Sequence, residues 1–167
     1  LHTLEKQLEE SLALHQGIVG DAARARILEL MAKVGIRDAE SRLGAYPHQL
    51  SGGQRQRIMI AMALANKPDV LIADEPTTAL DVTIQAQILE LLADLKKTED
   101  MGLLFITHDL GIVKRIADKV CVMKGGEIVE AGPVDQIFGN PQHEYTKTLL
   151  SARTVGAPDP VSQDADT

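Results

Sequence analysis

The carboxylates Asp74 and Glu75 stand side by side directly after the apolar run Val70–Ala73. An unbroken apolar run of this length predicts a strand that is buried on both faces of a parallel sheet. Ligands of such sheets bind at the carboxyl ends of the strands. Because neighbouring side chains of a strand point to opposite faces, the two carboxylates would have different tasks. One can hold Mg²⁺ or its water shell and the other can polarise an attacking water, although a solvated strand end explains the pair equally well.

Two further groups of residues are of types that can bind phosphate. The Ser-Gly-Gly-Gln stretch at residues 51–54 has the form of a capping box, which predicts a helix start whose N–H groups favour an anion. A plain helix cap is the alternative. His108 follows a second apolar run, Leu103–Thr107, which also predicts a buried strand, and it precedes Asp109, which is expected to cap a helix. A histidine there can contact a phosphate or hold a water, or it can be purely structural.

The rest of the pattern predicts the elements that must position these residues. Leucines at every fourth position of residues 4–12 indicate an amphipathic helix, and Asp81 is expected to cap a longer one. Lys119–Met123 reads as a third strand, followed by a hairpin turn at residues 124–127. Strands alternate with helices over residues 51–123, which predicts an α/β fold with right-handed crossovers and a largely parallel sheet.

Composition narrows the classes of function. The 167 residues suit one domain, and the net charge of −7 argues against a surface that neutralises nucleic-acid phosphate. With two Phe, two Tyr and no Trp, an aromatic stacking platform is not expected. Cys121 is the single cysteine, so no intrachain disulfide or cysteine metal cluster can form. Residues 154–167 contain two prolines, three aspartates and no basic residue, which predicts a disordered tail or linker.

In order and spacing, these motifs resemble those of the ATP-binding-cassette (ABC) ATPases over roughly residues 1–152. The resemblance assigns nucleotide contacts to Ser51, Gly52, Gly53 and Gln54 in the family signature and to Asp81 at the end of the D-loop. It assigns a metal contact to Asp74 of the Walker B strand, and catalytic roles to Glu75 and the switch histidine His108. Stretches 46–49, 77–83 and 143–146 are similar to the branch that energises oligopeptide and dipeptide importers, with Glu144 where that branch has proline.

Two motifs of the family are missing from the sequence. None of the thirteen glycines is followed by lysine, so there is no phosphate-binding loop of the form Gly-x-x-x-x-Gly-Lys-Ser/Thr, and the glutamine loop is missing too. The resemblance therefore indicates the carboxyl-terminal part of one cassette. It divides into a helical signature subdomain at residues 1–66, the Walker B half of an incomplete P-loop-type ATPase core at 67–153, and the tail at 154–167.

The resemblance implies an ATP-binding subunit of an importer for peptides or related solutes. The parent protein would hydrolyse ATP to ADP and phosphate with Mg²⁺, while the chain alone would be inactive without the lysine loop. Its partners would be a second ABC cassette, integral membrane subunits and a solute-binding protein, with no nucleic acid. It would be peripheral, at the cytoplasmic face of the inner membrane. The alternative is an ABC-type ATPase that acts on ribosomes or DNA.

The missing loop also has a consequence for the sheet. In the family, the strand that feeds the lysine loop separates the strand before His108 from the strand that contains Cys121. Without it, two strand edges and apolar side chains such as Leu104 and Ile106 would be uncovered. The two strands could pair directly, the β part could be loose, or a second copy could supply the pairing, and we expect self-association.

Overall fold

The computed structural model describes residues 2–154. They form two compact units, which divide between Ile106 and Thr107. Within this part of the chain, no helix has the length and apolar character needed to cross a membrane. The boundary that we expect at residue 66, between the helical subdomain and the Walker B half, is a functional division and stays a prediction.

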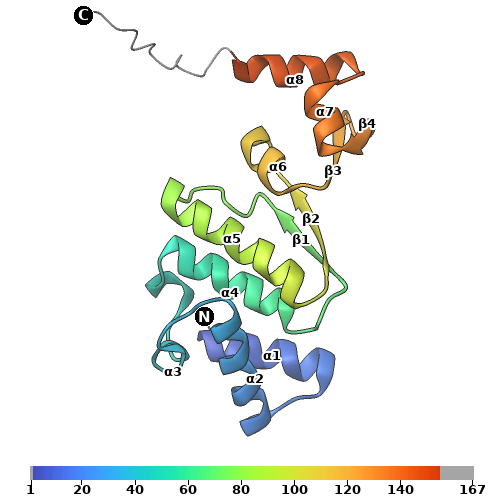
Figure 1. Ribbon diagram of the computed structural model, residues 1–167. Helices are drawn as coiled ribbons and strands as arrows, with labels where there is room; N and C mark the ends of the chain where they lie inside the picture. The colour runs from blue at the N-terminus through green and yellow to red at the C-terminus, as the bar shows by residue number, and fades with distance from the viewer. Residues whose placement is uncertain (1, 155–167) are drawn as a thin grey trace, which may run out of the picture. The chain divides into compact units, whose positions relative to one another are not determined.

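The amino-terminal part of the first unit is helical (Figure 1). The leucines at positions 4, 8 and 12 are buried, as their spacing predicts, and Gly17 ends their helix in the left-handed conformation at φ 66°. The second helix packs against the first and the fourth. In chain order the elements are α1 (Leu4–Gln16), α2 (Gly20–Lys33), α3 (Ala39–Arg42), the 3-10 turn η1 (Pro47–Gln49) and α4 (Gly52–Leu64).

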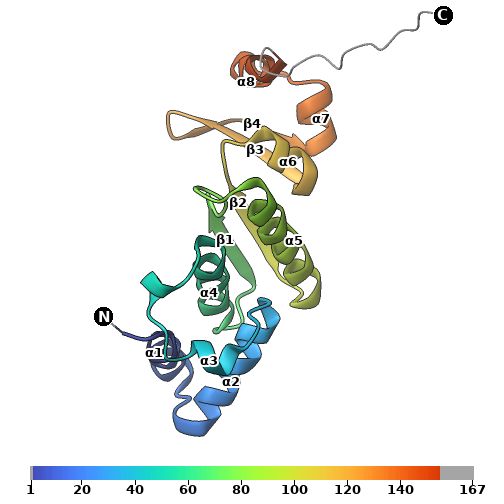
Figure 2. The same ribbon diagram turned by 90° about the vertical axis from the view of Figure 1, so that its left-hand side faces the viewer.

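A strand–helix–strand unit follows, made of β1 (Val70–Asp74), α5 (Val82–Thr98) and β2 (Gly102–Ile106). The two strands are parallel, with Val70 opposite Gly102 and Asp74 opposite Ile106. Both α4 and α5 lie on one side of this sheet (Figures 1 and 2). The side chains of Leu71 and Ala73 are buried in the same core as those of α4 and α5. The expected parallel pairing is confirmed, and it brings the ends of both strands to one edge.

The prediction that these strands are buried on both faces is wrong. Burial alternates along β1, and the apolar side chains of the opposite face are between 44% and 63% exposed. The exposed residues are Val70, Ile72, Leu104 and Ile106. Since α4 and α5 lie on the same side of the sheet, only one of its two faces is covered by helices of the first unit. We call these four residues the uncovered sheet face.

The second unit contains α6 (Leu110–Ile116), β3 (Lys119–Lys124), β4 (Glu127–Pro133), α7 (Val134–Gly139) and α8 (Glu144–Thr154). The third predicted strand does not extend the parallel sheet: in the described residues it pairs antiparallel with β4 alone. Gly125 and Gly126 both have positive φ and close the predicted two-residue hairpin turn that joins β3 to β4. Apart from Thr154, which ends α8, the expected tail at residues 154–167 lies outside the described residues.

Candidate functional site

The signature residues form the start of α4. The Ser51 hydroxyl accepts a hydrogen bond from the Gln54 backbone N–H at 3.2 Å, and the Gln54 side-chain oxygen accepts one from the Ser51 N–H at 3.1 Å. The predicted capping box is thus present. Ser51 and Gly52 are exposed, so a ligand can reach the helix start. N–H groups in the first turn have no partner within the helix and can donate to an anion.

The D-loop residues form a compact turn before α5. Ala79 lies in the left-handed region at φ 63°, and the Leu80 N–H donates to the Thr77 carbonyl at 3.3 Å. The Asp81 carboxylate then accepts from the Ile84 N–H at 2.8 Å, which confirms the predicted cap of α5. A carboxylate at this end of a helix also interacts favourably with the helix dipole. One hydrogen bond within the turn and one at the start of α5 therefore hold the D-loop in place.

The starts of α4 and α5 lie against each other. A Cβ atom added at Gly53 would be 2.6 Å from Ile84 Cγ2, and one added at Gly52 would be 3.3 Å from Leu80 Cδ2. At Gly53 there is no room for a side chain, whereas at Gly52 the neighbouring Leu80 side chain would have to give way slightly. The structure thus brings the signature glycines together with the residues that flank Asp81.

The acidic pair lies at the carboxyl edge of the parallel sheet, as predicted. Asp74 is the last residue of β1 and is exposed. Glu75 is half-buried, its backbone N–H donates to the Ile106 carbonyl at 2.8 Å, and its φ is 47°. This left-handed conformation costs a non-glycine residue about 1–2 kcal/mol, so it persists because the surroundings impose it. The strand ends at this point and the chain turns away.

His108 belongs to the second unit, in a segment whose backbone is fixed by its neighbours. The Asp109 N–H donates to the Thr107 hydroxyl at 3.0 Å, and the Asp109 carboxylate accepts from Gly111 and Ile112 at the start of α6. The predicted cap by Asp109 is confirmed. The catalytic role of His108 stays a prediction.

The donor set is compatible with Mg²⁺ that is bound through a nucleotide. Among residues 2–154, no group of three or more His, Cys, Asp or Glu side chains is arranged to hold a metal ion. Mg²⁺ commonly uses one or two carboxylates, phosphate oxygens and water rather than an all-protein cage. The single exposed carboxylate of Asp74 fits that mode.

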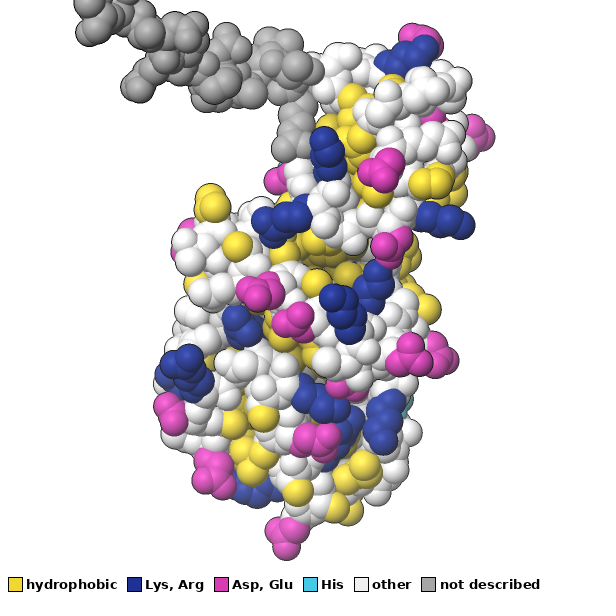
Figure 3. Space-filling view, viewed as in Figure 1, with side chains coloured by type: hydrophobic (Ala, Val, Ile, Leu, Met, Phe, Trp, Pro, Cys, Tyr) yellow, Lys and Arg dark blue, Asp and Glu magenta, His cyan; other side chains and the backbone are white. Residues whose placement is uncertain are grey.

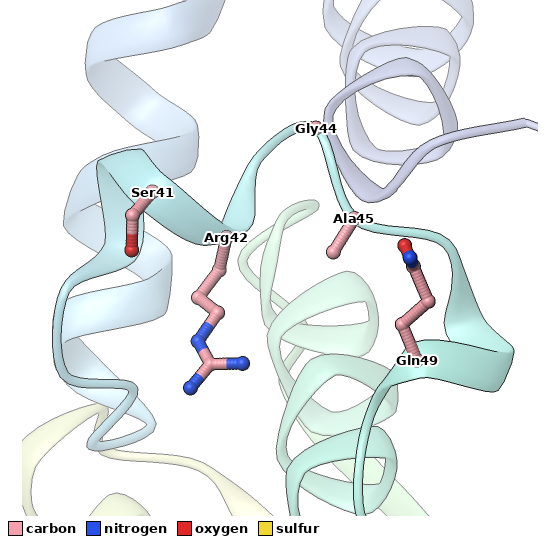
Figure 4. Close-up of a pocket in the computed structure, with 5 residues that line it drawn as sticks. All are labelled: Ser41, Arg42, Gly44, Ala45 and Gln49. Carbon is pink, nitrogen blue, oxygen red and sulfur yellow. The ribbon is translucent and has the colours of Figure 1, made fainter.

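Two other surface features lie apart from these motifs. A shallow hollow is lined by Ser41, Arg42, Gly44, Ala45 and Gln49, and the side chains of Arg42 and Gln49 face it from opposite sides (Figure 4). On the face shown in Figure 3, acidic and basic side chains alternate over the helices of the first unit. That face carries no continuous basic surface of the kind that binds a nucleic-acid backbone.

The fold places the chain among ATP-binding cassettes. It superimposes on the inward-facing structure of a putative metal-chelate type ABC transporter with a TM-score of 0.75 and 25% identity, over 90% of this chain and 58% of that one. The dimeric structure of the bacterial ABC transporter cassette MJ0796 gives a TM-score of 0.68 and 32% identity, over 80% of this chain and 57% of that one. The chain is therefore an α/β ATPase core of the P-loop type, present in part, with a helical signature subdomain.

Sequence comparison identifies the family. Residues 2–78 match the family model described as "ABC transporter". The chain is 66% identical over 158 residues to the peptidoglycan transport ATP-binding protein YejF of Agrobacterium fabrum, covering 95% of this chain and 29% of that protein. It is 57% identical over 147 residues to the oligopeptide transport ATP-binding protein OppD of Bacillus subtilis, covering 88% of this chain and 41% of that protein. The chain belongs to the ABC transporter ATPase family, which confirms the resemblance. It spans less than half the length of these curated relatives.

Sequence reasoning missed two sets of residues near these motifs. The spacing of Ile84 indicates a core position, but nothing in the sequence pairs it with Gly53. Glu130, on β4, accepts hydrogen bonds from the N–H groups of Gln142 at 2.7 Å and His143 at 3.0 Å. The Thr146 side chain beside it, together with these two donors, lowers the pKa of Glu130. The stretch at 143–146 is thus the start of α8, held by a carboxylate twelve or more residues away.

Proposed function

We propose that the chain is the carboxyl-terminal part of an ATP-binding cassette, in a protein that hydrolyses ATP to drive import of peptides or related solutes. The observation that carries the proposal is the placement of the motifs. The signature lies at the start of α4, the D-loop aspartate caps α5, and the acidic pair ends β1. The family membership and the names of the relatives support the same function.

The residues at these places have separable tasks in the proposal. ATP supplies the phosphoryl group, and Mg²⁺ neutralises its charge. Asp74 would hold the metal through its carboxylate, and Glu75 would accept a proton from the attacking water and orient it. His108 would contact the terminal phosphate held by its own cassette.

A second cassette completes the site in this proposal. Ser51 and the N–H groups of Gly52 and Gly53 would face an ATP that is held mainly by the lysine loop of the partner cassette, and Gln54 would keep Ser51 in place through the capping box. Asp81 would lie at the seam between the two cassettes. The dimeric cassette structure among the fold's relatives supports such an arrangement.

The other partners in this proposal are those that an importer requires. Integral membrane subunits would bind the cassette at the cytoplasmic face of the inner membrane, and a solute-binding protein would deliver the substrate. Selection of that substrate would reside in these partners, because the motif residues of this chain contact nucleotide.

Co-purification of the full-length protein tests the proposal against an ATPase that acts on ribosomes or DNA. We expect integral membrane subunits to co-purify in mild detergent, and the complex, reconstituted in vesicles with its solute-binding protein, to accumulate labelled oligopeptide only with Mg-ATP. A Glu75→Gln protein should assemble normally and fail to accumulate peptide. Ribosomal RNA or DNA in the preparation, with no membrane subunit, would instead establish the alternative.

A further inference from the structure

The contact between Gly53 and Ile84 joins two helix starts that the proposed function assigns to the seam. The nearest atoms to a Cβ on Gly53 all belong to Ile84, with Cγ2 at 2.6 Å. Real Cβ atoms do not approach a neighbour so closely, so an added methyl group would force one helix to move. By contrast, the 3.3 Å contact at Gly52 is to Leu80 Cδ2, the far end of a flexible side chain that can turn aside.

Ile84 has little freedom to make room. Its Cγ2 is attached to the branched Cβ, and in a helix such side chains strongly prefer one χ1 rotamer. Its backbone N–H is held by the Asp81 carboxylate at 2.8 Å, and its side chain packs against the core. One turn further along α5, Ile88 is fully buried.

The helix that carries Gly53 is held equally firmly. Ile58 and Ala61 of α4 are buried in the core. Arg57 donates a 2.7 Å hydrogen bond to the Val34 carbonyl at the end of α2. Since neither helix can shift without disturbing this core, the contact fixes the distance between the signature turn and the D-loop turn.

We propose that Ile84 is a positioning residue for ATP hydrolysis, because it sets the place of the signature turn against the D-loop turn through its contact with Gly53. This inference rests on the proposed function. Glycine is then required at position 53 because Ile84 Cγ2 occupies the space of a side chain there. The approach of a phosphate to the helix start would be a second, separate reason. The two reasons can be separated by changing Ile84 alone.

The test is a rescue experiment in the full-length protein. Gly53→Ala should lower kcat for ATP by about tenfold to a hundredfold, the scale of a misplacement near 1 Å. The affinity of the protein for a fluorescent ATP analogue should be unchanged, since the lysine loop holds the nucleotide. Ile84→Leu, which keeps the side-chain volume and removes the methyl group at Cβ, should restore most of the lost kcat in the double variant.

Matched variants make the result specific. Ile84→Val keeps the Cγ2 methyl group on a branched Cβ, so it should not rescue Gly53→Ala. Leu91→Ala, on the same helix, should not rescue it either. Gly44→Ala, where an added Cβ has no neighbour within 4 Å, should leave kcat unchanged. The proposal is overturned if the Gly53→Ala and Ile84→Leu double variant folds and is as inactive as Gly53→Ala alone. It is also overturned if Ile84→Val rescues as well as Ile84→Leu.

Thermal unfolding of the same variants tests the contact without reference to activity. We expect Gly53→Ala to lower the unfolding midpoint and Ile84→Leu to recover part of that loss. If the wild-type protein has no ATPase activity but this recovery is observed, the proposed function fails and the packing contact stands. If the double variant instead loses as much in its unfolding midpoint as the two single variants together, Gly53 and Ile84 are not coupled and the inferred contact is wrong.

Discussion

The backbone N–H of Glu75 donates a 2.8 Å hydrogen bond to the carbonyl of Ile106. This bond continues the parallel ladder one residue beyond Asp74, and the left-handed conformation of Glu75 then turns the chain away. The main chain of Glu75 is therefore fixed at the carboxyl edge of the sheet. A general base needs such fixed placement before its pKa matters.

Ser51→Arg in the full-length protein should abolish the ATP-dependent association of two cassettes. The substitution places bulk and positive charge at an exposed helix start, where the proposed function has the phosphate approach. Size-exclusion chromatography with and without ATP measures the effect. Ser51→Ala is the control: it loses the helix cap, at a cost of about 1 kcal/mol of stability, but leaves the approach open. Association that survives in Ser51→Arg would show that the signature is wrongly assigned.

Glu130→Gln should lower the thermal unfolding midpoint of the chain near pH 7. The two carboxylate oxygens each accept one N–H, from Gln142 and His143, and an amide has only one oxygen to offer. Because the folded state lowers the pKa of Glu130, its contribution is present above the unfolded pKa and is lost as the pH falls through the folded pKa.

Melting curves over a pH series therefore test both the contact and its charge. The wild-type and Glu130→Gln midpoints should converge as the pH falls below about 4, the range of an unperturbed glutamate. Glu127→Gln, an exposed position on the same strand, should change little at any pH. A gap between wild type and Glu130→Gln that stays constant down to pH 2 would contradict the assignment.

The isolated chain should self-associate through the uncovered sheet face. Four apolar side chains lie together there beside unpaired strand edges, a combination that favours association. Light scattering over a concentration range should show a rising mean mass, and Ile72→Asn with Leu104→Asn should reduce it. Met59→Asn, exposed on α4, is the control. A mass equal to one chain at every concentration would show that the uncovered sheet face stays exposed to solvent without causing association.

The isolated chain should also hydrolyse ATP negligibly. The sequence has no lysine loop, and fixed charges of that kind usually supply the largest part of transition-state stabilisation. Steady-state phosphate release at saturating Mg-ATP measures it. Turnover on the ordinary enzyme scale of ~1–10³ per second, from a pure sample, would refute this expectation.

The local elements of this fold could be predicted, because their signals lie within a few residues. The capping box at Ser51 and the caps at Asp81 and Asp109 each depend on neighbours two or three positions away. The places of Asp74 and Glu75 followed from one apolar run and its end.

The features that could not be predicted depend on contacts between distant parts of the chain. The runs around Ile72 and Leu104 are apolar on both faces, so the sequence cannot show that α4 and α5 cover only one of them. The hairpin of β3 with β4 has a local signal at Gly125, but nothing in the apolar run of β3 shows that this strand lies outside the parallel sheet of β1 and β2. The contact of Gly53 with Ile84 joins residues that are 31 positions apart and has no local signal.

Steady-state phosphate release by the full-length protein at saturating Mg-ATP tests whether this chain supplies the catalytic carboxylate of an ABC-type ATPase. Glu75→Gln should reduce turnover by about 10²–10⁴-fold, the usual contribution of a general base, while ATP binding is retained. Glu90→Gln, exposed on α5, should match the wild type. Unchanged turnover in Glu75→Gln, with the protein folded and ATP bound, would show that Glu75 is not the catalytic carboxylate.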